Sequence, residues 1–241
     1  MYCGPNSQAQ IGHQANYQFQ TDERGADLCG GRYVLVQTEV KDALIQYLQQ
    51  TIANFYGSDP QKSPDYPRII SQSHFDRLVD LISDQAEKIV FGGQLDRESL
   101  YIALTIMDQV DWGDKVMQGE IFGPILPILS YVQIETAIDR INQVANPLSL
   151  SIFTRNRQLA QSVTRECAFG CGCVNDVTTY FANYRLPFGD VDDSGIGRYH
   201  GRHSIEEFSH QKPITDRVGW LDMPIRYPPF DRPFLGLSKI R

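Results

Sequence analysis

The sequence predicts an α/β protein whose main domain has three layers, with a mostly parallel sheet between two layers of helices. Short apolar runs alternate with amphipathic stretches of about ten residues, which is the order of strands and helices in a parallel sheet. These runs are apolar without interruption, as expected where helices cover both sheet faces. After residue 177 the pattern stops, and an irregular extension begins that is first Gly-rich and then Pro-rich.

Two helices are predicted in the first third of the chain. Thr38 has the side chain of a helix cap at the start of the first helix, and Gly57 is expected to end it. Ser73 is expected to open the second helix. The apolar positions are Val40, Leu44, Ile45, Leu48, Ile52 and Phe55 in the first helix, and Phe75, Leu78, Val79 and Ile82 in the second.

Strands are predicted wherever a short apolar run is bounded by turn residues. The run 101–107 is expected to alternate in polarity. The predicted strands are 33–36, 88–91, 101–107, 125–131, 148–153 and 171–177, with further helices at 134–144 and 157–167. Ala137, Ile138 and Ile141 are expected to face inward from the first of these helices.

The two ends of the chain lack this order. Residues 1–24 have no hydrophobic period and are expected to be loose. Residues 178–201 form a long Gly-rich segment, and a segment of that length inside a domain is usually functional. Ile205 to Ile214 is expected to be an outlying strand. The predicted divisions are therefore 1–24, a catalytic-type domain at 25–200, and an oligomerisation strand with an extended tail at 201–241.

Composition excludes several classes of function. The chain has 241 residues, a formal net charge of -7 and a pI of about 5.2, whereas nucleic-acid binders usually present a basic face. No apolar run approaches the roughly 20 residues of a membrane span. The polar N-terminus does not resemble a secretory signal. A cytoplasmic protein is expected.

The cysteines do not indicate a disulfide framework or a metal centre. Their number is odd, and they are spread over a long chain: Cys3, Cys29, Cys167, Cys171 and Cys173. Cys171 and Cys173 are separated by one residue, and no second pair follows at zinc-site spacing. They are interpreted as buried strand cysteines, and no metal is predicted.

The segment 119–124 reads Gly-Glu-Ile-Phe-Gly-Pro and leads into the apolar run 125–129. It resembles the Glu-Ile-Phe-Gly-Pro signature of the aldehyde dehydrogenase superfamily. Further matches follow in family order: Ser-Pro-Asp-Tyr at 63–66, Arg-Ile-Ile at 68–70, Leu-Pro-Phe-Gly at 186–189, Ser-Gly-Ile-Gly at 194–197 and Tyr-His-Gly at 199–201. The resemblance is closest to the class 3 and fatty aldehyde branch. It covers residues 33–230 and only the C-terminal part of such an enzyme.

The family oxidises an aldehyde to an acid with NAD or NADP. This chemistry needs a thiolate nucleophile, donors for the oxyanion, a bound dinucleotide and a carboxylate base. By resemblance, Cys29 is the tentative nucleophile, although ungapped alignment on Gly25 and Tyr33 places Leu28 in the nucleophile position. Asp27 beside Cys29 would raise the pKa of its thiol, which disfavours the thiolate. Cys29 is therefore interpreted as a relic.

The remaining site residues form one wall of the family's site. By resemblance, Glu120 holds ribose hydroxyls of the cofactor and Phe122 packs beside the cofactor. Phe188 lines the substrate tunnel, and Asn175 lies on the strand near the nucleophile. The alternatives are core packing for Phe122 and Phe188, and a surface carboxylate for Glu120.

Other positions depart from the family pattern. The Gly-Gly-Val-Gly-Asn loop of the family reads Gly-Asp-Val-Asp-Asp at 189–193, and Gly119 stands where a second acid is usual. The oxyanion Asn, the general-base Glu and the Gly-rich dinucleotide turn belong to the family's N-terminal half, and residues 1–24 contain no Gly-x-Gly-x-x-Gly turn. NAD or NADP binding by this chain alone is therefore expected to be weak.

Three interpretations remain open from the sequence. The chain is an aldehyde dehydrogenase relative that is inactive alone, half of a split enzyme, or a non-catalytic interaction module that uses the edge strand 205–214. The corresponding partners are a second copy of the chain or a missing N-terminal half, with a small aldehyde as substrate. The acid-rich loop and the shifted cysteine favour the first interpretation.

Overall fold

The computed structural model describes residues 2–3, 32–177, 179–217, 219 and 226–228. The chain forms two compact units, Met1–Glu207 and Phe208–Arg241. The helices and strands named below lie in the first unit.

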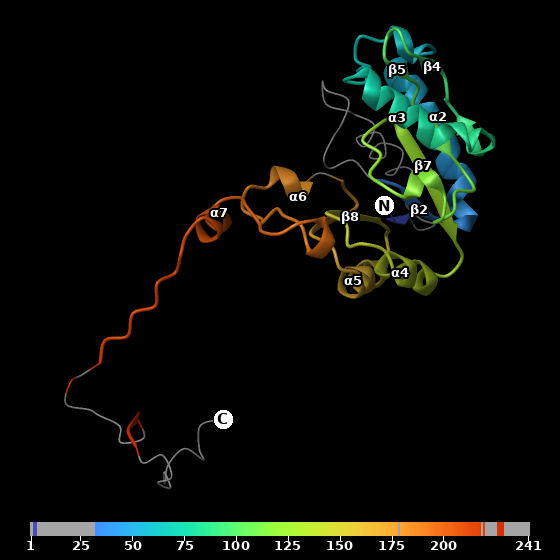
Figure 1. Cartoon of the computed structure of the whole chain (residues 1–241). Helices are drawn as coiled ribbons and strands as arrows, with labels where there is room; N and C mark the ends of the chain where they lie inside the picture. Colours follow the sequence, from blue (N-terminus) through green and yellow to red (C-terminus); the bar gives the residue numbers. More distant parts are fainter. Residues whose placement is uncertain (1, 4–31, 178, 218, 220–225, 229–241) are drawn as a thin grey trace. The chain divides into compact units, whose positions relative to one another are not determined.

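A seven-stranded sheet forms the centre of the first unit, in the order β3-β6-β7-β2-β1-β8-β9 (Figure 1). Every neighbouring pair is parallel except β3 with β6, which confirms the predicted mostly parallel sheet. Its strands are β1 (Tyr2–Cys3), β2 (Val34–Gln37), β3 (Ile89–Phe91), β6 (Thr105–Met107), β7 (Ile125–Tyr131), β8 (Ser149–Phe153) and β9 (Cys171–Val174).

The antiparallel pair has a local cause in the chain between its strands. A parallel neighbour needs a crossover, usually a helix, to bring the chain back to the same edge of the sheet. Residues 92–104 contain no helix and instead form the separate hairpin β4 (Leu95–Asp96) and β5 (Tyr101–Ile102). The chain therefore returns in the opposite direction.

Helices cover both faces of the sheet and produce the expected three layers. One core cluster joins α3, α4 and α5 to one face of the sheet, and a second joins α2 to the other. Figure 1 shows α4 and α5 next to each other. The helices are α2 (Lys41–Tyr56), α3 (Gln72–Ser83), α4 (Ile134–Asn142), α5 (Arg157–Glu166), α6 (Thr179–Ala182) and α7 (Arg202–Glu207).

Short 3-10 turns complete the regular structure. They are η1 (Thr38–Val40), η2 (Pro60–Lys62), η3 (Ala86–Lys88), η4 (Lys115–Met117) and η5 (Asp192–Ser194).

The sheet is buried on both sides, as its apolar strands predict. In β2, Val34 and Val36 pack against α2, whereas Leu35 belongs to the cluster of α3, α4 and α5. Ile128 of β7 is fully buried. Alternate residues of each strand therefore supply both cores.

The helix faces follow the sequence pattern with one exception. Phe75, Leu78 and Ile82 of α3 are buried, and so are the three predicted inward residues of α4. On α2, Phe55 is exposed and the neighbouring Tyr56 is buried in its place.

Two predicted helix starts are wrong. The Thr38 hydroxyl donates to the Tyr131 carbonyl over 2.9 Å, which ties the ends of β2 and β7, and α2 begins only at Lys41. The second helix is capped by Ser71, whose hydroxyl accepts from the His74 backbone N–H, and not by Ser73. Gly57 ends α2 as predicted, at a φ of 76°.

Three further expectations need correction. Residues 101–107 form two short strands that are buried throughout, so the predicted alternation of burial is absent. Tyr2–Cys3 pairs between β2 and β8, although this end was expected to be loose. The expected strand 205–214 is absent: α7 occupies residues up to Glu207, and no regular element follows in 208–217. A strand is stable only with a hydrogen-bonded neighbour, and none pairs with this segment within the described chain.

Gly92 offers a test of how the turn after β3 is built. Its φ is 79°, and an added Cβ would lie 2.0 Å from the Leu104 carbonyl oxygen. We expect Gly92→Ala to lower the free energy of unfolding by more than about 3 kcal/mol, because strain and a backbone clash combine. Urea unfolding followed by tryptophan fluorescence measures this.

Gly57→Ala is the matched control, because Gly57 also has a positive φ but open space around its Cβ position. We expect Gly57→Ala to lower the free energy of unfolding by about 1–3 kcal/mol, from backbone strain alone. Equal costs for the two variants would show that the Leu104 contact is not rigid.

Candidate functional site

The loop 118–124 connects η4 to β7 and carries two predicted site residues. Ile121 is buried and anchors the loop, whereas Glu120 is exposed and Phe122 is half-buried. Phe122 has a φ of 47°, which is rare for a bulky residue. The loop is therefore held in one strained conformation that leaves the Glu120 side chain accessible.

Two basic side chains of α3 hold this loop by its backbone. The ring Nε2 of His74 lies 2.6 Å from the Phe122 carbonyl oxygen. The Arg77 guanidinium donates to the Glu120 carbonyl over 3.1 Å and also to the Ile121 carbonyl. Three successive carbonyls thus accept hydrogen bonds from one helix.

The loop lies where β7 begins, at the edge of the sheet where its parallel strands start. Phe188 lies at the same edge, because it packs with Cys171, the first residue of β9. In the sheet order β9 is four strands from β7, which is roughly 19 Å at the usual spacing. Glu120, Phe122 and Phe188, which were predicted to form one wall, thus share an edge of the sheet but lie next to different strands.

An aromatic cluster surrounds Phe188. Its ring stacks on Tyr180 at 6.1 Å and meets the Tyr199 ring edge-on at 5.4 Å. Phe188 and Tyr199 also exchange two backbone hydrogen bonds. The ring of Phe181 is half-exposed and also contacts Phe188. Phe188 is therefore both a packed residue and the centre of an apolar wall.

Asn175 has a structural task at the opposite edge of the sheet. It follows β9, and its side-chain amide donates to the Thr154 carbonyl over 3.1 Å and accepts from the Thr154 N–H over 2.9 Å. Its φ is 59°. Since the oxygen and the NH2 group of the amide both bind the backbone of Thr154, just after β8, this side chain joins the ends of β8 and β9.

The predicted nucleophile Cys29 lies outside the described residues. Of the others, Cys171 is buried and Cys173 half-buried, so the interpretation as buried strand cysteines holds fully for Cys171 alone. Burial, with a smaller effect of the Glu166 charge, raises the pKa of the Cys167 thiol to about 11. Cys167 is thereby kept as an unreactive thiol.

Within the part of the chain that the structure describes, no three His, Cys, Asp or Glu side chains gather as a metal site would require. Among the same residues, no helix has the length and apolar character needed to cross a bilayer.

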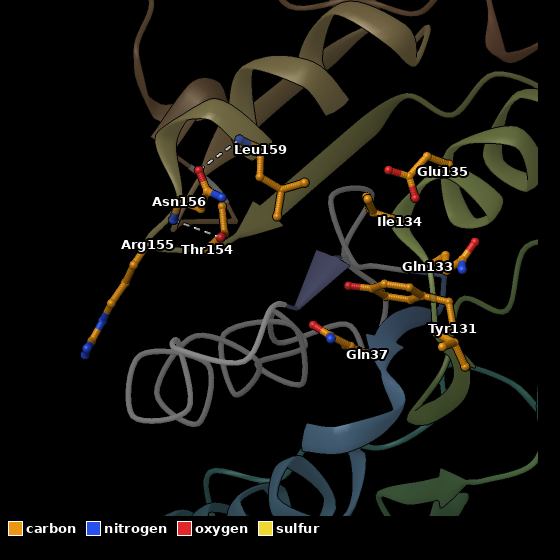
Figure 2. Close-up of a pocket in the computed structure, with 10 residues that line it drawn as sticks. Gln37, Tyr131, Gln133, Ile134, Glu135, Thr154, Arg155, Asn156 and Leu159 are labelled. Atoms are coloured by element: carbon orange, nitrogen blue, oxygen red, sulfur yellow. Dashed lines mark hydrogen bonds between the residues drawn. The ribbon is translucent and has the colours of Figure 1, made fainter.

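A cavity of about 460 Å³ lies at the edge where the strands end (Figure 2). It is lined by the last residues of β2 and β7, by the residues after β8, and by the starts of α4 and α5. Its members are Gln37, Tyr131, Val132, Gln133, Ile134, Glu135, Thr154, Arg155, Asn156 and Leu159.

Sequence reasoning did not find this cavity. The available signal was that three predicted strands end there and that ligands of open α/β sheets often bind at such ends. The cavity lies at the edge opposite Glu120, so it is separate from the predicted cofactor wall.

The comparisons with known proteins identify the family of this chain. Residues 19–214 match the aldehyde dehydrogenase family. The chain belongs to this family. It is 43% identical over 202 residues to 4,4'-diaponeurosporen-aldehyde dehydrogenase of Staphylococcus aureus, covering 84% of this chain and 44% of that protein. It is also 43% identical over 199 residues to aldehyde dehydrogenase family 3 member A2 of Mus musculus, covering 82% of this chain and 41% of the relative.

Solved structures show the same relationship. The substrate-bound state of Staphylococcus aureus AldH has a TM-score of 0.86 at 38% identity and covers 95% of this chain and 50% of that one. An indole-3-acetaldehyde dehydrogenase solved in complex with NAD+ shares the fold, with a TM-score of 0.76 at 22% identity. The aldehyde dehydrogenase relative described here thus spans about half the length of the proteins it matches.

The structure shows how Asp192, which departs from the family pattern, is held. Asp192 stands where the family has glycine, and its φ is 53°. Its carboxylate accepts a 2.6 Å hydrogen bond from the Asn146 side chain. The position therefore retains a conformation that favours glycine, at a cost of about 1–2 kcal/mol.

The role of Asn175 can be tested by stability. Asn175→Ala loses two hydrogen bonds and places alanine at positive φ, so we expect a loss of about 2–4 kcal/mol. Asn175→Gly removes the same bonds without the backbone strain and should lose less. Urea unfolding of both variants measures the difference.

Asn183→Ala is the control, since exposed Asn183 accepts one local hydrogen bond, from the Arg185 N–H. This substitution should lower the free energy of unfolding by less than about 1 kcal/mol. If Asn175→Ala were as mild as this control, the joining role would be wrong.

Proposed function

We propose that this chain forms two walls of an NAD(P)-dependent aldehyde dehydrogenase site and is inactive by itself. The observation that carries the proposal is the loop 118–124, which α3 holds so that the Glu120 carboxylate stays exposed beside β7. Family membership supplies the reaction class: oxidation of an aldehyde to a carboxylic acid.

The residues present fit the ribose side of the cofactor. A carboxylate accepts hydrogen bonds, and the two ribose hydroxyls donate them, so Glu120 suits that part of NAD. The half-buried Phe122 ring supplies apolar contact beside it. When bound, NAD would accept the hydride of the reaction, while these residues hold and orient it.

The second wall suits an aldehyde with an apolar chain. Phe188 and its aromatic neighbours present rings and few charges at the same sheet edge. Asn175, by contrast, uses its amide to join strand ends, so we assign it no contact with substrate.

A second half completes the site in this proposal. Relatives are about twice as long as this chain. Large apolar side chains lie exposed between α6 and α7, as a surface covered by another polypeptide segment would be: Phe181, Tyr184, Leu186, Ile196, Tyr199 and Ile205. The segment is a further part of a longer chain, a separate N-terminal half or a second copy.

The cofactor test compares the chain alone with a two-part complex. We expect NAD to bind the 241-residue chain no more tightly than millimolar, because Glu120 and Phe122 contact only one side of the ribose. Co-expression with the N-terminal part of the Staphylococcus aureus relative should tighten binding at least tenfold, and Glu120→Gln should reverse much of that gain. Isothermal titration calorimetry measures both.

Each outcome has a distinct meaning. A complex that binds NAD and oxidises decanal is a split enzyme. One that binds NAD without oxidation supports the inactive relative, and one that forms without binding NAD contradicts the proposal. Glu87→Gln, an exposed change away from the loop, is the matched control.

A separate labelling test addresses Cys29. As a relic, it should react with iodoacetamide at pH 6.5 no faster than Cys3, because an ordinary thiol with a pKa of roughly 8.5 is mostly protonated there. Cys167, with its raised pKa of about 11, should react slowest. Peptide mapping by mass spectrometry gives the order, and selective labelling of Cys29 would identify it as a nucleophile instead.

A further inference from the structure

We infer that His74 and Arg77 of α3 are positioning residues for the cofactor ribose: they hold the backbone of the loop that carries Glu120, and so place its carboxylate within reach of the ribose. The inference rests on the proposed function, because it gives Glu120 a ribose to bind. Neither α3 residue needs to touch the cofactor.

The hydrogen bonds themselves select this role. Carbonyl oxygens only accept, so the 2.6 Å contact with the Phe122 carbonyl requires His74 Nε2 to carry the proton. The other ring nitrogen, Nδ1, is then free to accept from Arg77 Nε, which lies 3.4 Å away. His74 therefore donates to the loop from Nε2 and accepts from Arg77 at Nδ1, which aligns the guanidinium.

The guanidinium in turn has the shape for two carbonyls. Its two terminal nitrogens donate separately to the carbonyls of Glu120 and Ile121. A lysine at this position would carry the charge but could not reproduce the planar pair of donors. Charge alone is thus insufficient for this contact.

Packing beneath the loop leaves little room for an alternative path. A Cβ on Gly123 would lie 2.6 Å from the Leu78 side chain, so the loop backbone rests directly on α3. Phe122, at a φ of 47°, is strained by about 1–3 kcal/mol and keeps this conformation only while its surroundings enforce it. Its own carbonyl is the group that His74 binds.

These backbone contacts determine where the Glu120 side chain leaves the loop. Glu120 is exposed, and its carboxylate forms no hydrogen bond or ion pair within the described residues, so the held backbone places its Cα and thereby limits the region that the carboxylate can reach. With the carbonyls of residues 120–122 held, the backbone of Glu120 is in place before the cofactor arrives, and only its side-chain rotamers remain to be ordered. A backbone that is already ordered strengthens binding by reducing the ordering cost.

The first experiment tests the loop in the 241-residue chain alone. A Glu-specific endoprotease cuts after Glu120 when the loop can leave α3. We expect Arg77→Met and His74→Phe to accelerate this cut about tenfold or more, because hydrogen bonds to held carbonyls are lost. His74→Gln keeps a donor for the Phe122 carbonyl and should remain within about threefold of the parent rate.

The control variant is Arg97→Gln. Arg97 pairs with Asp76 of the same helix over 2.8 Å but does not touch the loop. Its rate should equal that of the parent chain. Unchanged cutting in both Arg77→Met and His74→Phe, with folding verified by circular dichroism, would overturn the inference.

The second experiment measures NAD affinity of the same variants in the two-part complex by calorimetry. Arg77→Met and His74→Phe should weaken NAD binding about tenfold, Arg77→Lys should restore little, and His74→Gln should restore most of it. A parent complex that binds no NAD contradicts the proposed function. A parent complex that binds NAD, with Arg77→Met binding equally well, overturns the inference alone.

Discussion

The parallel pairing of β2 with β7, buried on both faces, is the constraint on which the other features depend. Their register joins Val34 to Ile128 and Gln37 to Tyr131. Because the parallel strands share one direction, the segments that precede them emerge at one edge and the segments that follow them emerge at the other. This places Glu120 at the starting edge, and Asn175 and the cavity at the ending edge. Phe188 lies at the starting edge because its segment returns to pack on Cys171, the first residue of β9.

Three of the residues discussed above combine backbone strain with an anchoring contact. Phe122, Asn175 and Asp192 all have positive φ, and a hydrogen bond anchors each of them. A strained residue persists only where its surroundings over-determine it. The segments that carry these three residues are therefore held by specific contacts and not by chain stiffness.

Two parts of the molecule that bear on function differ in how well they are covered. The loop 118–124, which is proposed to face the ribose, is hydrogen-bonded to α3, whereas the large apolar side chains on and between α6 and α7 are exposed. Relatives are about twice as long, and the proposal assigns the other contacts of the cofactor to a further segment. Within this chain the informative residues are those that shape the loop rather than those that react.

The sequence by itself determined the strand and helix order, the three layers and the family, because apolar periodicity and turn motifs are local signals. It also led to the prediction that Glu120 and Phe122 contact the cofactor, which stays a prediction. Only the tertiary structure decided that Ser71 and not Ser73 caps α3, that Thr38 binds the end of β7, and that residues 202–207 are helical. It also decided that the Asn175 amide joins strand ends and that His74 and Arg77 hold the loop. These contacts link residues that are distant in sequence, such as Arg77 and Ile121, and no local pattern specifies which distant carbonyl a side chain will reach.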